Sequence, residues 1–214
     1  MTLLLGLDTA TDRPTLALAA GGVPGADVAL ANRRDLSRDI ERAAARLLAD
    51  HGARPADLTG VVVADGPGSF TGLRIGIAFA KGLCRGLGVP LFTAPSLLGA
   101  ARAAAPAGGT VLVAYDALRG EVYRAVYRIT TGAAPRVEVA LAAALAAAES
   151  PVPYAGALIP AGARWASAAA LLALVGVPNG AIPVAEPADW EPAYGRPAEA
   201  EARLLARHGR PADA

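Results

Sequence analysis

Residues 66–72, Gly-Pro-Gly-Ser-Phe-Thr-Gly, have the composition of a tight loop between a strand and a helix. They follow the apolar, β-branched run 61–64, which is typical of a buried strand. Backbone N–H groups at such a helix start can hold an anion, which makes Gly66, Gly68 and Ser69 candidate phosphate contacts. The Gly-Lys-Ser/Thr ending of a Walker loop is missing, and Ser69 can equally cap the helix.

A second group of candidates consists of carboxylates at the ends of predicted strands, where ligand sites of α/β folds gather. Asp8, followed by Thr9, ends the first apolar run, and Asp116 and Glu121 flank a later turn. Asp8 could handle a metal or a phosphate, or it could be a turn-forming residue that bonds to its own backbone. These two interpretations of Asp8 and Thr9 stay open at the level of sequence.

Metal and nucleophilic chemistry have few candidate residues. The chain holds two histidines, His51 and His208, and one cysteine, Cys84. A zinc or iron site usually needs three or four such ligands, and a Ser-His-Asp triad needs a well-placed histidine. We therefore expect no metal ligands, no catalytic residues and no cofactor.

The segment that follows the loop has an unusual stripe of small residues. Gly72, Gly76 and Ala80 recur every fourth residue, and Gly82 and Gly86 repeat that spacing on a neighbouring face. Glycine inside a helix costs roughly 0.5–1 kcal/mol relative to alanine, so the stripe needs a reason. Small residues at this spacing let another backbone approach closely. The approaching element could be the helix 35–51 of the same chain or a helix of another subunit.

The elements that would position these residues follow the order β-β-β-α-β-α-β. The predicted strands are 3–7, 15–19, 28–31, 61–64 and 89–93, and the predicted helices are 35–51 and 71–87. This order is that of a ribonuclease-H-like lobe, to which we assign residues 1–105.

We assign residues 106–196 to a smaller second α/β lobe. It would hold a strand pair at 110–115 and 121–129, two Ala- and Leu-rich helices at 139–148 and 162–175, and a possible strand at 151–156. A charged helix at about 197–208 would pack back on the first lobe.

Composition limits the classes of function. The 214 residues are 54% hydrophobic and carry a net charge of +1, so the whole molecule has no field that would attract nucleic acid or an anionic membrane. The single cysteine fits a reducing compartment, and the N-terminus lacks the basic region of a signal peptide. The apolar stretch 72–91 carries three basic residues, so we expect no membrane span and a cytoplasmic location.

Four motifs in order resemble the bacterial TsaB family. They are Leu-Asp-Thr-Ala-Thr at 7–11, Gly-Pro-Gly-Ser-Phe-Thr-Gly-Leu-Arg-Ile-Gly at 66–76, Tyr-Asp-Ala-Leu-Arg-Gly-Glu-Val-Tyr at 115–123 and Glu-Pro-Ala-Tyr-Gly-Arg at 191–196. The second motif is the most specific. The resemblance implies an actin-like, Hsp70-like ATPase fold with two lobes, of which the second is reduced.

The resemblance also implies a function. A TsaB-like chain would be a non-catalytic scaffold that acts with TsaD and TsaE in threonylcarbamoylation of the adenosine 3′ to the anticodon, in tRNAs reading codons that begin with A. It would form a homodimer when alone and meet tRNA indirectly, through the complex. The alternative is a stand-alone ATPase or sugar-kinase-like phosphotransferase that uses Asp8 and the loop 66–72.

In TsaB-like chains the first two helices form the interface, which by analogy falls on 35–51 and 71–87. The implied contact residues here are Leu36, Ile40, Ala43, Leu47, Gly72, Leu73, Gly76, Ile77 and Ala80.

Overall fold

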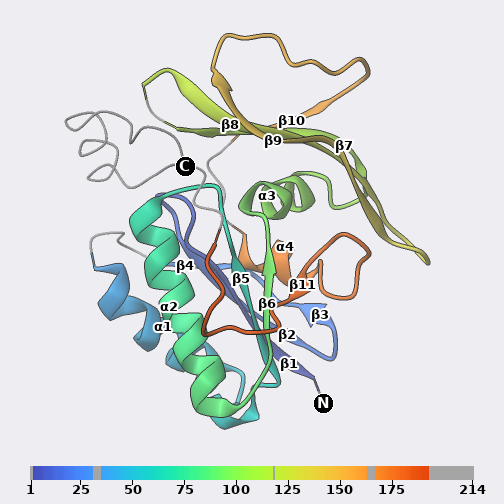
Figure 1. The fold of residues 1–214 in the computed structure, drawn as a ribbon. Helices are drawn as coiled ribbons and strands as arrows, with labels where there is room; N and C mark the ends of the chain where they lie inside the picture. The colour runs from blue at the N-terminus through green and yellow to red at the C-terminus, as the bar shows by residue number, and fades with distance from the viewer. Residues whose placement is uncertain (1, 31–34, 118, 163–166, 193–214) are drawn as a thin grey trace, which may run out of the picture.

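The larger of two sheets contains seven strands and carries the N-terminal half of the chain (Figure 1). The computed structural model describes residues 2–30, 35–117, 119–162 and 167–192. The strands of this sheet are β1 (Leu3–Asp8), β2 (Thr15–Ala20), β3 (Val23–Pro24), β4 (Val28–Ala29), β5 (Gly60–Ala64), β6 (Leu91–Ala94) and β11 (Ile182–Pro183). The strand β1 pairs with β2 antiparallel and with β5 parallel, and β5 pairs with β6 parallel.

The parallel strands need crossover connections, and two helices supply them. Helix α1 (Leu36–Asp50) precedes β5, after the short 3-10 turn η1 (Pro55–Asp57), and α2 (Phe70–Leu87) joins β5 to β6. All five residues of β5 are buried, as the run of valines predicts for a central strand. Figure 1 shows α1 and α2 on one side of this sheet and α3 and α4 on the other. The predicted helices 35–51 and 71–87 are thus confirmed.

The second sheet has the order β10-β7-β8-β9. Its strands are β7 (Gly109–Asp116), β8 (Glu121–Thr130), β9 (Arg136–Ala147) and β10 (Ile159–Gly162), and α3 (Ser96–Ala104) lies between the two sheets (Figure 1). The strands β7 and β8 form the antiparallel pair that the sequence predicted.

Three predictions for the second half are wrong. Residues 139–148 were expected to be helical, but all except the last belong to β9, because pairing with β8 along its length outweighs the helix propensity of alanine and leucine. Helix α4 (Ala168–Leu172) is much shorter than the helix expected at 162–175. The possible strand at 151–156 is irregular, and the strand lies later, at β10.

The assignment of all of residues 106–196 to a second lobe also needs correction. Helix α4 packs on β1, β2 and β5, and β11 pairs with β6, so both elements belong to the first sheet. A single hydrophobic core runs through both sheets. The helix expected at 197–208 lies outside the described residues.

Candidate functional site

The loop 66–72 is interlocked with the turn between β1 and β2. The Ser69 backbone N–H donates to the carbonyl of Ala10 over 2.7 Å, and a side chain at Gly68 would collide with the same residue. The Gly66 N–H donates to the Ser96 hydroxyl over 3.1 Å, and the Gly72 N–H donates to the Ser69 hydroxyl over 3.1 Å. Ser69 is therefore the N-cap of α2, and these three N–H groups are bound within the chain.

Asp8 is completely buried at the end of β1. Its Oδ1 accepts the N–H of Ala10 over 3.1 Å, and its Oδ2 accepts the N–H of Ser167 over 3.2 Å. Burial raises the pKa of Asp8 to about 7; the two hydrogen bonds oppose this rise, and the charge of Asp27 adds to it. The pKa of Asp8 is thus close to neutral pH, and both of its carboxylate oxygens accept hydrogen bonds from the backbone.

A second carboxylate, Asp27, fixes the start of α4 beside Asp8. The Ser167 hydroxyl donates to Asp27 Oδ2 over 2.7 Å, and Asp27 Oδ1 accepts the N–H of Ala169 over 2.8 Å. Ser167 also caps α4 by accepting the N–H of Ala170 over 3.0 Å. Local sequence patterns do not predict this contact, because about 140 residues separate the partners. A serine ahead of an Ala- and Leu-rich run was the local signal for the cap.

Tyr115 links the second sheet to the same region. Its hydroxyl donates to the Ser96 carbonyl over 3.1 Å, and burial together with the nearby Asp8 raises its pKa well above the usual value. Asp116 and Glu121 lie on either side of the turn that joins β7 to β8.

In the described parts of the chain, no three His, Cys, Asp or Glu side chains are grouped to hold a metal ion. None of the described helices is long and apolar enough to cross a membrane.

The small residues of α2 fall on two different faces. Gly72 and Gly76 are buried against Thr9, whose backbone and side chain would collide with any side chain at these positions. The close approach that the sequence predicted therefore comes from the β1–β2 turn of the same chain, and not from α1 or from another subunit.

The implied interface residues need the same correction. Most of them are core residues of this chain, so their side chains are not available to a partner: Leu36, Ile40, Leu47, Leu73, Ile77 and Ala80. Ala43 is half-buried and packs against the same core. Periodicity identified the apolar face of each helix, but it could not tell an internal core from an external contact.

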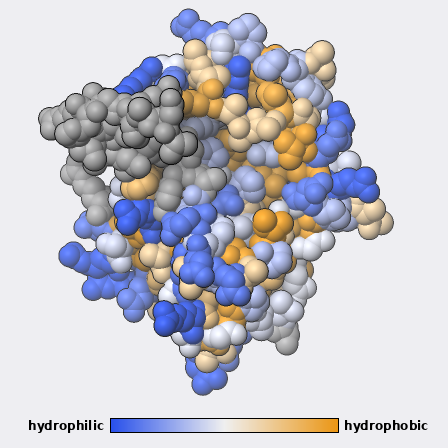
Figure 2. Space-filling view, viewed as in Figure 1, coloured by the Kyte–Doolittle hydropathy of each residue, from blue (hydrophilic) through white to orange (hydrophobic). Residues whose placement is uncertain are grey.

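The opposite face of α2 is open. Ala78, Gly82 and Gly86 are exposed at a spacing of four residues, and Ile75 and Phe79 beside them are only half-buried. A side chain added at Gly82 or Gly86 would meet no described atom within 4 Å. Figure 2 shows hydrophilic side chains over α1 at the left, and hydrophobic and hydrophilic side chains mixed over α2. We call these five residues the open face of α2.

Comparisons with known proteins agree on one relationship. Residues 20–165 match the model of the family described as TsaD: tRNA N6-adenosine threonylcarbamoyltransferase. The tRNA threonylcarbamoyladenosine biosynthesis protein TsaB of Escherichia coli is 37% identical over 127 residues, which cover 58% of this chain and 54% of that protein. The chain belongs to the TsaB family. TsaB of Bacillus subtilis is 41% identical over 86 residues, which cover 40% of this chain and 38% of the relative.

The fold of this TsaB-family chain agrees with a solved structure. YeaZ from Pseudomonas aeruginosa superposes with a TM-score of 0.72 at 24% identity, covering 82% of this chain and 91% of that one. The predicted actin-like, ribonuclease-H-like ATPase fold is confirmed. The chain spans about half the length of the curated relatives that it matches.

Proposed function

We propose that this chain is a non-catalytic scaffold subunit in the biosynthesis of threonylcarbamoyladenosine. With TsaD and TsaE it would support transfer of the threonylcarbamoyl group to the adenosine 3′ to the anticodon, in tRNAs reading codons that begin with A, in the cytoplasm. The similarity to TsaB proteins of two bacteria supports this function. The net charge of +1 supports an indirect contact with tRNA, because binding to a polyanion usually relies on an excess of basic residues.

The observation that carries the proposal is the open face of α2. A glycine inside a helix lowers the stability of the helix, and a close contact in the space that the glycine leaves can offset this cost. Ala78, Gly82 and Gly86 leave such a space along two turns, and the half-buried Ile75 and Phe79 supply apolar surface beside it. A helix of TsaD would lie in this space, and a second copy of the chain would occupy it when TsaD is absent.

The environment of Asp8 favours docking over the alternative, a stand-alone ATPase or phosphotransferase. A phosphate cradle needs N–H groups directed at the ligand. Here the N–H groups of Gly66, Ser69 and Gly72 donate within the chain, and the carboxylate of Asp8 accepts two backbone N–H groups. The loop 66–72 thus serves to seat α2 on the β1–β2 turn.

The test is the association of purified chain with TsaD from the same genome, measured by light scattering coupled to gel filtration and by calorimetry. Gly82→Leu places a large side chain on the open face, where an added Cβ would meet no described atom within 4 Å. We expect it to weaken association at least about tenfold, because it fills the space that the partner helix needs. The free energy of unfolding should not fall, because leucine favours a helix more than glycine does.

Ala103→Leu is the matched control, since Ala103 is an exposed small residue on a different helix, α3. This variant should bind TsaD like the wild type. Equal weakening by both variants would reject the placement of the interface. A wild-type chain that neither binds TsaD nor supports formation of the modified nucleoside with TsaD and TsaE would reject the function. Tight binding of ATP and magnesium by the isolated chain would favour the enzyme alternative.

A further inference from the structure

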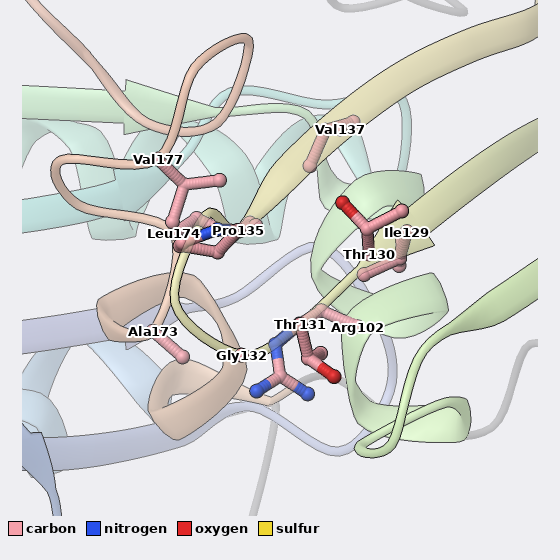
Figure 3. A pocket seen from close by; sticks show the side chains of 10 residues that line it. All are labelled: Arg102, Ile129, Thr130, Thr131, Gly132, Pro135, Val137, Ala173, Leu174 and Val177. Carbon is pink, nitrogen blue, oxygen red and sulfur yellow. The ribbon is translucent and has the colours of Figure 1, made fainter.

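A hollow of about 240 Å³ lies between the end of α3, the β8–β9 turn and the segment after α4. Its ten lining residues, shown in Figure 3, are Arg102, Ile129, Thr130, Thr131, Gly132, Pro135, Val137, Ala173, Leu174 and Val177. We call it the Arg102 pocket. The function proposed above assigns no role to this pocket.

The walls of the Arg102 pocket are mostly aliphatic. The apolar surface that a ligand can reach comes from Pro135, which is exposed, and from Ala173 and Val177, which are half-buried; the other aliphatic lining residues are at most 3% exposed. An apolar wall gains free energy when it contacts apolar ligand atoms in place of water. The walls therefore favour a ligand with an aliphatic portion.

One charged side chain lines the pocket, and it is a cation. Arg102 stands in the last turn of α3, and among the described residues its guanidinium makes one hydrogen bond, from Nη1 to the Pro106 carbonyl over 3.3 Å. Figure 3 shows the guanidinium between Ala173 and Thr131 at the edge of the pocket. A guanidinium has five N–H donors in a planar fork that matches a carboxylate. None of the described lining residues has a carboxylate that could neutralise it.

The pocket volume sets the size of the ligand. At about 30 Å³ for each water molecule, 240 Å³ corresponds to about eight water molecules, or a ligand of about eight non-hydrogen atoms. A carboxylate uses three of these atoms, which leaves an aliphatic chain of about five carbons. The geometry points to a binding site for a small aliphatic monocarboxylate, whose carboxylate pairs with Arg102 and whose chain lies against Pro135, Ala173 and Val177.

Hexanoate is the probe that matches this size, and hexanamide is its uncharged counterpart. We expect hexanoate to bind the full chain at one saturable site with a Kd on the order of 1 mM, as for a ligand of so few atoms. In ¹³C-methyl NMR spectra the shifts of Ile129, Leu174 and Val177 should follow one binding curve. Hexanamide should bind at least about tenfold more weakly, because it cannot form the charge-assisted pair.

Arg102→Gln should weaken hexanoate binding at least about tenfold and leave hexanamide binding unchanged. Arg46→Gln is the matched control: it removes the same charge from an exposed position on α1 and should bind hexanoate like the wild type. If Arg102→Gln loses its folded NMR spectrum, Arg102→Lys replaces it. This variant keeps the charge and loses the planar fork, so hexanoate binding should weaken several-fold.

Three results would overturn the assignment. They are the absence of saturable hexanoate binding up to about 20 mM, equal weakening by the Arg102 and Arg46 variants, and inorganic phosphate binding as tightly as hexanoate and displacing it. The last result would show that the aliphatic walls contribute nothing. Binding to TsaD plays no part in this test, so its outcome is independent of the proposed function.

Discussion

Helix α2 has glycines four residues apart on two of its faces, and the surroundings of the two pairs differ. On one face Gly72 and Gly76 lie against Thr9 inside the chain, and on the other no described atom lies within 4 Å of a side chain added at Gly82 or Gly86. A glycine every fourth residue therefore indicates close approach but does not say what approaches. The contrast teaches that contacts within the chain offset the conformational cost of the glycines at the start of the helix, whereas no described atom fills the space beside those at its end.

The largest expected effect is on the internal face. Gly72→Ala should lower the free energy of unfolding by about 3 kcal/mol, because the added methyl group would collide with the backbone carbonyl of Thr9, which cannot rotate away. Chemical denaturation of the variant and the wild type measures this difference. A loss below about 0.5 kcal/mol would contradict the described packing of α2 on the β1–β2 turn.

The same comparison corrects an expectation about Gly76. The resemblance to TsaB places Gly76 in the subunit interface, where Gly76→Leu would weaken association and leave the monomer folded. In the structure Gly76 lies against the side chain of Thr9, so we expect this substitution to destabilise the fold itself.

A second prediction concerns Asp8, which anchors the turn that fills the internal face. Its pKa rises from 3.8 to about 7 on folding, so between these values the native state holds a proton that the unfolded state has lost. The free energy of unfolding should therefore fall as pH rises from about 4 to about 7, by on the order of 4 kcal/mol from this group.

Asp8→Asn removes this titration, so the variant should lack that part of the pH dependence. It also loses one of the two acceptors for the N–H groups of Ala10 and Ser167, and below about pH 4 it should be less stable than the wild type. Denaturation series at several pH values measure both effects. Parallel pH profiles for variant and wild type would show that Asp8 does not titrate in this range.

The smallest expected effect is on the open face. Gly82→Ala should raise the free energy of unfolding by about 0.5–1 kcal/mol, because alanine favours the helix and the added methyl group meets no described atom. Thermal and chemical denaturation, run beside Gly72→Ala, give the comparison directly. Destabilisation by Gly82→Ala would mean that this face is also filled within the chain.

Local sequence signals predicted the first half of the fold well and the second half less well. In α1 and α2 the apolar residues recur with a clear helical period, and both helices were placed within a residue or two. The segment 139–148 has no readable period, because alanine and leucine occupy both faces of it. Its conformation follows from the pairing of β9 with β8, which is a non-local interaction.

The sequence also identified one part of the candidate site and not another. The motif residues Asp8, Thr9, Gly66, Gly68 and Ser69 were all singled out by sequence, and the structure brings them together. The Asp8 carboxylate and the N–H groups of Gly66 and Ser69 bond within the chain, which does not favour a role in holding a phosphate. Asp27 and Ser167 were missed, because only folding brings residues 140 positions apart into contact.

The sequence by itself determined the family, the central strand β5, the two crossover helices and the small-residue character of α2. These features depend on residue type and short spacing, which the chain carries in any conformation. Only the tertiary structure decided which glycines of α2 are buried, how the Asp8 carboxylate is paired, and that β9 is a strand. These depend on which atoms fill the space beside each residue, and that is set by segments distant in sequence.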